Sequence, residues 1–271
     1  MFMKQEGISI LCIQETHLAD TEYFEEDGFL TFLSGGSFTG SRLFSGVGFI
    51  VAPWAKQSII SFKGITDRLA CLRVKVTGGI LNVLTTYVPH DGIEFSIRHE
   101  FFTLLAEHTR RNHNHETSLV CGDFNAQLGR VDAGETEMIG PYVYRKLLRE
   151  HSGRTPNRSL LLEYCGTHDL LVMNSHFEYP DNFLVTYRNL VTSPFDNVFD
   201  GGFSQIDFIL CHQDKADMMY DCWSCREFPF NSHHFPVIAS VLVEFPKVHR
   251  QVPPRKCISS LRAYVSCTGI K

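Results

Sequence analysis

The sequence predicts a mixed fold of the α/β or α+β class, in which two β-sheets pack face to face and helices lie outside them. Short apolar runs typical of β-strands dominate the chain, and a few amphipathic segments with helical spacing lie between them. The length of 271 residues fits one large domain or two small ones, and a two-layer α/β enzyme fills this length alone.

The first half of the chain is expected to consist mainly of strands. Its first apolar run, ISILCI, is long enough for a buried strand, and the last run alternates as a half-buried strand does. The two glycines Gly78 and Gly79 come just before that last run and favour a hairpin-like turn. The strands expected here span residues 8–13, 47–52, 70–76 and 80–88.

The second half is expected to alternate helices with strands. Residues 94–111 have apolar positions with helical spacing, at Phe95, Phe101, Phe102, Leu104 and Leu105. Two shorter helices are expected over residues 142–149 and 159–166, the second with Ser159 as its N-cap. The remaining strands are expected over residues 118–121, 170–174, 183–188, 206–211 and 237–243.

The segment VCGDFN, residues 120–125, carries the most informative chemistry. A strand ends in glycine, and Asp123 and Asn125 follow two residues apart, on the same side of the pleat. Hydrolysis of a phosphodiester needs such a pair: one group for the attacking water and one neutral donor for a phosphate oxygen. The alternative is a turn that ends a strand, because Gly, Asp and Asn all favour turns.

Three further segments supply polar groups at similar positions. QETHL (residues 14–18) follows the first strand, SQIDFIL (204–210) places Asp207 in an apolar run, and SHHFPV (232–237) lies near the end. Taken in order with VCGDFN, these segments resemble the exonuclease–endonuclease–phosphatase superfamily over roughly residues 5–245. Residues 14–18 and 122–129 (GDFNAQLG) are most similar to the apurinic-type endonuclease domain of non-LTR (LINE-like) retrotransposons.

The resemblance implies a four-layer sandwich of two mixed β-sheets flanked by helices, with the active site at one end of the sheets. The family domain opens with a strand that delivers an asparagine to the metal. We expect residues 1–245 to form an N-terminally truncated domain that lacks this strand, which leaves a sheet position unpaired. After Glu244 the chain holds six Lys or Arg residues and no acid, so residues 246–271 are expected to form a basic flexible tail.

The resemblance also assigns catalytic roles. Glu15 would be the metal ligand, as suits a hard cation such as Mg²⁺. Asp123 would take or position the proton of the attacking water, and Asn125 would hold the phosphate. Asp207 would fix the tautomer and charge of His234, which would stabilise charge that develops on the phosphate. Tyr87 matches the family tyrosine that hydrogen-bonds the scissile phosphate.

Residues at the substrate edge follow from the same resemblance. Thr186 and Tyr187 are similar to a family pair beneath the site, Ser204 would lie near the substrate, and Arg188 would meet a DNA phosphate. His233 occupies a position on the metal side where the family has aspartate. An imidazole there suits Mn²⁺ better than Mg²⁺, so Mg²⁺ is the expected cofactor and Mn²⁺ the alternative.

The function implied is a metal-dependent endonuclease that nicks DNA to leave a 3′-hydroxyl, once fused to a reverse transcriptase. His233 and the missing strand both remove oxygen ligands, so we expect weakened activity or none. One alternative is a phosphatase or sphingomyelinase-like member of the same superfamily. The other is a non-catalytic remnant that binds DNA or protein.

The amino-acid composition indicates the cellular environment in which the protein works. The net charge of −5 argues against a protein that simply coats nucleic acid. Nine cysteines, several of them inside apolar runs, favour a reducing, intracellular environment. No apolar stretch approaches the roughly 20 residues of a membrane helix. We therefore expect an intracellular, nuclear monomer that does not contact a membrane.

Overall fold

A computed structural model describes most of the chain. The described residues are 2–18, 21–36, 45–109, 115–129, 131–144, 155–189, 202–227, 232–243 and, for the backbone alone, 260–267. The helix expected over residues 142–149 falls outside these ranges except for residues 142–144, which are not helical.

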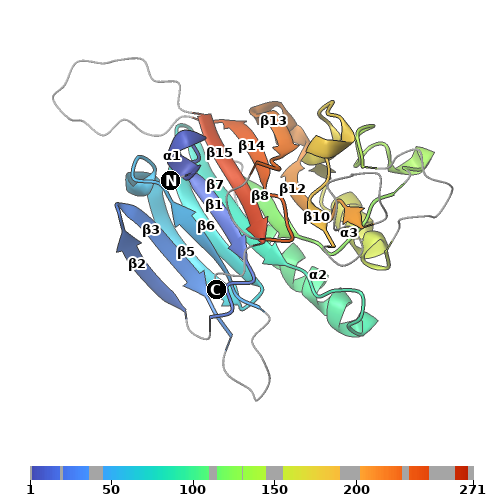
Figure 1. The fold of residues 1–271 in the computed structure, drawn as a ribbon, viewed down its shortest axis with the longest axis horizontal. Helices are drawn as coiled ribbons and strands as arrows, with labels where there is room; N and C mark the ends of the chain where they lie inside the picture. The colour runs from blue at the N-terminus through green and yellow to red at the C-terminus, as the bar shows by residue number, and fades with distance from the viewer. Residues whose placement is uncertain are drawn as a thin grey trace.

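Two β-sheets face each other (Figure 1). The first has seven strands in the order β13-β14-β15-β1-β4-β3-β2. All of its neighbours are antiparallel except β1 and β15, which run in the same direction. Its strands are β1 (Ile10–Gln14), β2 (Glu22–Glu26), β3 (Phe29–Ser34), β4 (Val47–Val51), β13 (Met219–Ser224), β14 (Val237–Leu242) and β15 (Ser260–Cys267).

The second sheet has six strands in the order β5-β6-β7-β8-β12-β9, and its parallel pair is β7 with β8. A small hairpin, β10 (Tyr187–Arg188) with β11 (Phe203–Ser204), stands apart from both sheets. The strands of the second sheet are β5 (Ile59–Thr66), β6 (Leu69–Val76), β7 (Gly79–Tyr87), β8 (Glu116–Asp123), β9 (Leu170–Val172) and β12 (Asp207–His212).

Alternation along each strand divides the apolar residues between two faces. In β8, Leu119 and Cys121 lie in the core between the sheets, whereas Val120 faces the helices. Strand β1 divides in the same way, with Cys12 between the sheets and Leu11 on the outer face. The inter-sheet core is therefore built from every second residue of the central strands.

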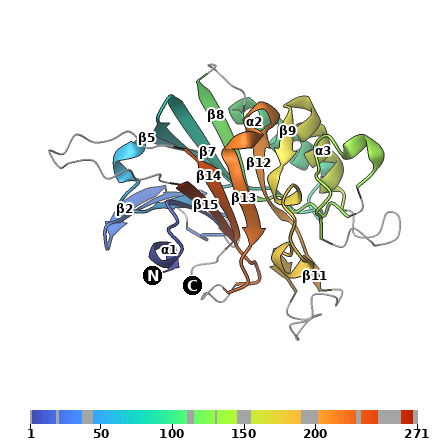
Figure 2. The same ribbon diagram turned by 90° about the horizontal axis from the view of Figure 1, so that it is seen from above.

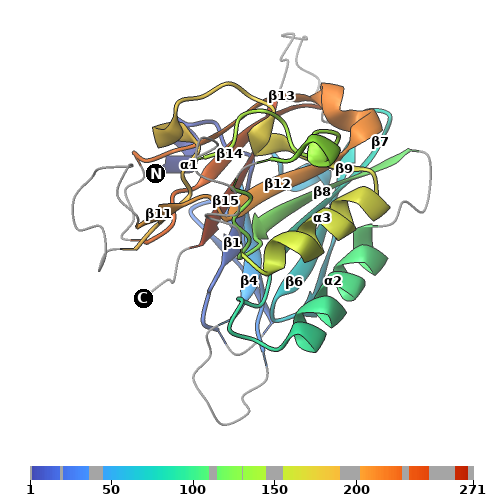
Figure 3. The ribbon, with the colours of Figure 1, turned by 90° about the vertical axis from the view of Figure 1, so that its right-hand side faces the viewer.

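Helices cover the two outer faces unequally (Figure 2). Helices α2 (Phe95–Thr109) and α3 (Asn157–Thr167) lie side by side across the six-stranded sheet (Figure 3). Helix α1 (Phe2–Gln5) packs Met3 against the outer face of the seven-stranded sheet. Five short 3-10 helices complete the described structure: Lys56–Ser58, Ala133–Glu135, Met173–Ser175, Asp181–Phe183 and Gln213–Met218.

The four-layer sandwich with two mixed sheets is confirmed, and most of the predicted strands lie within two residues of their expected bounds. Two local predictions are wrong. The strand expected over residues 183–188 is reduced to β10, preceded by a 3-10 turn, and the N-cap of α3 is Pro156, with Ser159 inside the helix. No helix among the described residues is long and apolar enough to cross a membrane.

The C-terminal part of the predicted tail is also corrected. Residues 260–267 form β15, an interior strand between β14 and β1. This strand, with the sequence SLRAYVSC, pairs through its backbone with β14 on one side and with β1 on the other. The rest of the predicted tail, residues 246–259 and 268–271, lies outside the described residues.

Candidate active site

The predicted catalytic residues gather where the inter-sheet core ends. Asp123 is the last residue of β8 and continues the inward-facing row of Leu119 and Cys121. Asp207 is the first residue of the antiparallel neighbour β12 and pairs directly with Asp123. Tyr87 ends β7 and pairs with Asp123 from the other side. The pleat thus delivers two acids and a phenol to one edge of the six-stranded sheet.

Gly122 allows these strands to meet so closely. A Cβ atom at this position would lie 1.9 Å from the carbonyl oxygen of Thr86 on β7. Any side chain would push β7 and β8 apart next to Asp123, which explains the glycine in the Gly-Asp-Phe-Asn string in packing terms.

Asp123, Asp207 and His234 form a buried cluster. Their ligand atoms all lie within 4.8 Å of one another. Burial, and then the charge of Asp207, raise the pKa of Asp123 well above its ordinary value, with Glu15 adding to the effect. A buried carboxyl group with a raised pKa is suited to receive a proton near neutral pH.

His234 completes this cluster as a cation. Its Nδ1 lies 3.2 and 3.1 Å from the two carboxylate oxygens of Asp207. Burial acts to lower the pKa of His234, but the neighbouring carboxylates, Asp207 first, raise it to about 9. The ring also meets the ring of Tyr187 edge-on, with centroids 4.9 Å apart. The Asp207–His234 pair predicted from the sequence is therefore present, and the imidazole is protonated at neutral pH.

Asn125 is held beside Asp123 by an unusual backbone conformation. Its φ angle of 48° is left-handed, which is uncommon for a residue other than glycine. Its backbone N–H donates to Asp123 Oδ1 at 2.7 Å, and its side-chain Nδ2 donates to the carbonyl oxygen of Val88 at 2.8 Å. The second N–H of the same amide group is not used in these two bonds, and its contact with a phosphate oxygen stays a prediction.

Glu15 reaches the same edge from the seven-stranded sheet. It follows β1 with a φ of 55°, and it accepts a hydrogen bond of 2.6 Å from the hydroxyl of Tyr87. Gln14 spans the sheets by donating from Nε2 to Thr85 Oγ1 at 2.8 Å. In the structure the Tyr87 hydroxyl donates to Glu15, the expected metal ligand, whereas the sequence predicted that it donates to the scissile phosphate.

The loop after Glu15 is pinned by backbone contacts. Thr16 N donates to Gly46 O at 3.1 Å and His17 N donates to Ser45 O at 2.9 Å. Gly46 N in turn donates to Asp67 O at 2.7 Å. The carboxylate of Glu15 is therefore carried by a fixed turn.

Of the residues expected at the substrate edge, Thr186 and Ser204 are buried and hold neighbouring residues of the cluster in place. Thr186 is fully buried, and its hydroxyl accepts from the backbone N–H groups of Ile206 and Asp207 at 2.9 and 3.1 Å. Ser204 is buried and pairs with Tyr187 in the hairpin. Thr186 and Ser204 therefore position Asp207 and Tyr187, in place of the substrate contact expected of Ser204.

Arg188 and His233 lie beside this cluster. Arg188 N donates to His233 O at 2.8 Å, and its guanidinium lies 6.0 Å from the ring centroid of Phe235. His233 is exposed, with its ring 6.3 Å from that of Tyr187. Among the described residues, the cluster of His, Asp and Glu ligand-type atoms is that of Asp123, Asp207 and His234, and His233 is not part of it. Because His234 is bonded to Asp207 as a cation, the atoms of this cluster open to a metal are carboxylate oxygens.

Sequence reasoning missed two buried asparagines that hold the catalytic strands. Asn174 donates to the carbonyl oxygen of Asp207 at 2.9 Å and accepts from Ile209 N at 2.9 Å. Asn157 donates to the carbonyl oxygens of Pro89 and Phe124 at 2.9 and 3.3 Å. A lone asparagine is typical of a turn, so neither position carried a signal.

Arg68 is a third residue that the sequence did not single out. Its guanidinium lies over the Tyr87 ring, 4.6 Å from the centroid, and Nη1 donates to the Tyr87 carbonyl oxygen at 3.3 Å. It places a cation beside the Tyr87–Glu15 pair, where an anionic substrate would approach.

The donor set fits a hard divalent cation. Glu15 is partly exposed and has one carboxylate oxygen bonded to Tyr87, which leaves the other for a ligand. Burial first, and then the charges of Asp207 and Glu15, raise the pKa of Asp123, and a cation among these carboxylates would relieve their repulsion. Oxygen donors of this kind are those that Mg²⁺ and Mn²⁺ bind.

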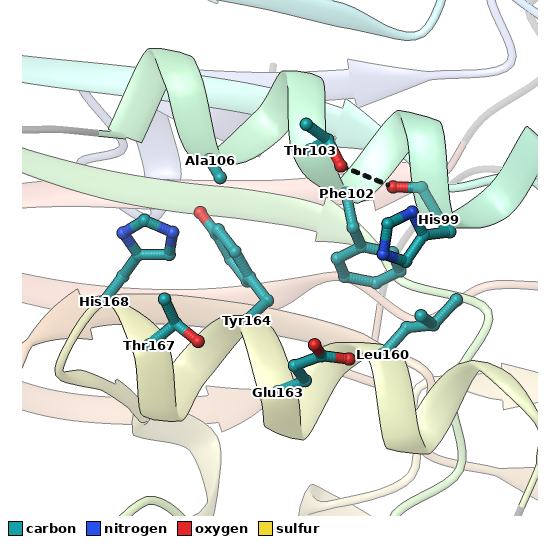
Figure 4. A pocket seen from close by; sticks show the side chains of 9 residues that line it. All are labelled: His99, Phe102, Thr103, Ala106, Leu160, Glu163, Tyr164, Thr167 and His168. Carbon is teal, nitrogen blue, oxygen red and sulfur yellow. Dashed lines mark hydrogen bonds between the residues drawn. The ribbon is translucent and has the colours of Figure 1, made fainter.

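A separate hollow lies between α2 and α3 (Figure 4). Phe102, Leu160 and Tyr164 line it together with His99 and His168. It shares no residue with the catalytic edge, and its aromatic lining belongs to the packing of the two helices against each other.

Comparison with known proteins identifies the family to which the sequence is similar. The profile of the endonuclease/exonuclease/phosphatase family matches residues 2–217. Craniofacial development protein 2 of Bos taurus is 26% identical over 213 residues, which are 78% of this chain and 32% of that protein. The chain thus spans about a third of the length of this curated relative.

Solved structures of similar fold are nucleases and a phosphatase. An AP endonuclease from Archaeoglobus fulgidus superposes with a TM-score of 0.62 at 18% identity, covering 89% of this chain and 91% of its own. The 3′ phosphatase NExo from Neisseria, bound to product DNA hairpin, gives 0.58 at 17%, with coverages of 88% and 89%. The endonuclease domain of TRAS1, a telomere-specific non-LTR retrotransposon, gives 0.56 at 12%, with 89% of each chain covered.

Proposed function

Because the chain belongs to the endonuclease/exonuclease/phosphatase family, we propose that it is a divalent-metal-dependent endonuclease that nicks DNA and leaves a 3′-hydroxyl. The observation that carries the proposal is the cluster of Asp123, Asp207 and His234, with ligand atoms within 4.8 Å of one another. The Glu15–Tyr87 pair borders this cluster, since Tyr87 and Asp123 pair across β7 and β8. Acid, base and metal ligand thus lie at one edge.

Asp123 acts on the attacking water. Its carboxyl group is buried and its pKa is raised, so it accepts a proton more readily than an exposed aspartate does. The hydrogen bond from Asn125 N fixes one of its oxygens at 2.7 Å and turns the carboxylate toward the edge. Asn125 holds a phosphate oxygen with its remaining amide N–H.

His234 stabilises the negative charge that builds up on the phosphate. Asp207 binds Nδ1, which leaves Nε2–H of the protonated ring to donate to a non-bridging oxygen. Arg68 supplies a second cation on the Glu15 side of the edge. A divalent cation held by Glu15 would act as a Lewis acid that polarises the phosphodiester.

DNA is the proposed partner because the similar solved structures include an AP endonuclease, a 3′ phosphatase bound to product DNA hairpin and a retrotransposon endonuclease domain. The retrotransposon type follows from the Gln-Glu-Thr-His-Leu and Gly-Asp-Phe-Asn-Ala-Gln-Leu-Gly strings. The same proposal includes a former fusion to a reverse transcriptase, action in the nucleus, and work as a monomer.

A substrate panel tests the proposal. The purified chain is incubated with Mg²⁺ and supercoiled plasmid, with a DNA hairpin that carries a 3′-phosphate, and with inositol phosphates or sphingomyelin. Nicked circles whose ends a polymerase can extend are expected, and Asp123→Asn should abolish them. Release of phosphate from the hairpin without nicking would replace the endonuclease with a 3′-phosphatase, and turnover of inositol phosphates or sphingomyelin alone would reject DNA as the substrate.

A further inference from the structure

Strand β15 joins two parts of the seven-stranded sheet that are otherwise unconnected. It pairs with β14 from Val237 to Leu242 and with β1 from Ile10 to Gln14. Among the described strands, β14 has β13 as its other neighbour and β1 has β4. Without β15, the pair β13–β14 and the group β1–β4–β3–β2 would share no backbone hydrogen bonds.

Each of these two parts of the seven-stranded sheet leads to a different residue of the candidate active site. Glu15 directly follows β1, whereas His234 lies three residues before β14. Asp123 and Asp207 belong to the other sheet, on adjacent strands. Each part docks on that sheet by its own contact: Glu15 accepts from Tyr87, and His234 bonds to Asp207. The separation of Glu15 and His234 within their own sheet therefore depends on the strand between them.

The register brings the carboxyl end of β15 to the same edge. β15 runs parallel to β1, and Cys267 pairs with Gln14, the residue before Glu15. On the other side Val265 pairs with Val237, at the start of β14. The backbone at residues 265–267 thus lies between the chain segments that lead to Glu15 and to His234.

We propose that β15 is part of the catalytic centre: it sets the spacing of Glu15 and His234, and its carboxyl end forms the wall of the site between them. This role rests on the proposed function, because it assigns β15 to the same phosphodiesterase site. The strand reaches this place through a connection of residues 243–259, much longer than the two to five residues that join hairpin neighbours.

Cross-linking in the full chain tests the placement. Ala239 and Ala263 are direct partners across β14 and β15, and opposite Cα atoms in antiparallel sheets are about 4.5–5.5 Å apart, within the range of a disulfide. The cysteine variants are made in a Cys222→Ala background, because the native thiol of Cys222 lies opposite Ala239 on β13 and would compete for it. In that background Ala239→Cys/Ala263→Cys should form the β14–β15 disulfide on mild oxidation, identified by peptide mass mapping. Ala239→Cys/Leu261→Cys is the matched control, because its cysteines are two residues out of register and should not cross-link.

Proline substitution tests the catalytic role. Ala263→Pro removes a backbone N–H from an interior strand, whereas Ala263→Ser keeps it. Ala263→Pro should nick plasmid about 100-fold more slowly than Ala263→Ser, the cost of a misplacement of about 1 Å. Hydrogen exchange should show lost protection in β1 and β14 and retained protection in β7 and β8.

Two results overturn the proposal: cross-linking that is no faster than in the control pair, and nicking by Ala263→Pro at the rate of Ala263→Ser. If Ala263→Pro does not fold, the cross-linked Ala239→Cys/Ala263→Cys protein tests the catalytic role of β15 instead. The oxidised protein should nick plasmid at least as fast as its reduced form. Loss of nicking on cross-linking would overturn the catalytic role of β15. If the unaltered chain nicks no DNA, the proposed function fails, while cross-linking and exchange still decide where β15 lies.

Discussion

At the scale of single residues, the site combines two buried acids, one buried cation and one partly exposed carboxylate. Asp123 pairs with Asp207 across two strands, His234 neutralises part of their charge, and Glu15 meets Tyr87 from the opposite sheet. Glu15 and Asn125 both have left-handed backbone angles. Such conformations cost free energy, and here they occur at two residues whose side chains the proposed mechanism uses.

Asp123→Asn should separate activity from stability. The folded protein binds the Asp123 proton more tightly than the unfolded chain does, so raising the pH above the ordinary pKa of 3.8 costs folding free energy. The amide removes this cost while its oxygen still accepts from Asn125. We expect the nicking rate to fall about 10²–10⁴-fold and the melting temperature at pH 8 to rise. A fall in the melting temperature would mean that the Asp123 charge serves the fold.

The rate should also depend on pH through His234. The Asp207–His234 ion pair contributes fully to stability below the ordinary histidine pKa of 6.5, and this contribution is lost as the pH rises through about 9. The proposed mechanism uses the charged ring, so kcat/KM should fall above a pH of about 9. Asp207→Asn should move this limb to lower pH. A profile that Asp207→Asn leaves unchanged would remove His234 from the mechanism.

At the scale of elements, buried polar hubs hold the loops that follow β7 and β8. Asn157, at the start of α3, bonds the carbonyl groups of Pro89 and Phe124 and accepts from Arg98 Nη1 at 2.8 Å. Phe124 lies between Asp123 and Asn125. Helix α3 therefore fixes the catalytic loop through one side chain.

Asn157→Ala should lower both stability and rate. It removes the hydrogen bonds that Asn157 gives to two carbonyl groups and one of the bonds of the Arg98 guanidinium, which costs about 2–4 kcal/mol. The loosened loop should reduce kcat about 10- to 100-fold. Asn82 is a matched control, because it accepts from Arg73 and donates to Glu116 at the far end of β7. Asn82→Ala should cost stability in chemical denaturation yet leave kcat unchanged. Equal effects of both variants on kcat would refute the positioning role.

Strands that are buried on both faces could be predicted from the sequence. An exposed strand, and a strand whose position depends on partners far away in the chain, could not. The runs ILCI before Gln14 and LVC before Gly122 are apolar, and both lie in central strands. Strand β2 reads EYFEE and is exposed along its length, so no apolar pattern marks it. Strand β15 follows a basic, proline-containing segment, and its place depends on partners more than 200 residues earlier in β1.

At the scale of the whole molecule, the site is a junction between two sheets. The six-stranded sheet supplies Tyr87, Asp123 and Asp207, and the seven-stranded sheet supplies Glu15 and leads to His234. The motifs alone identified these residues because their order along the chain is typical of the family. The hydrogen bond from Tyr87 to Glu15 and the supporting roles of Thr186 and Ser204 arise from the packing of distant segments, which no local pattern records.

The measurement that tests this account most directly is a double-mutant cycle on Mg²⁺-dependent plasmid nicking with Glu15→Gln and Asp123→Asn. Groups that act as one catalytic unit give losses that do not add. We predict that each variant alone reduces the nicking rate nearly to the level seen with EDTA and that the double variant is no slower than either. Losses that multiply, or equal nicking of the unaltered chain with Mg²⁺ and with EDTA, would contradict a single metal-dependent site built from both sheets.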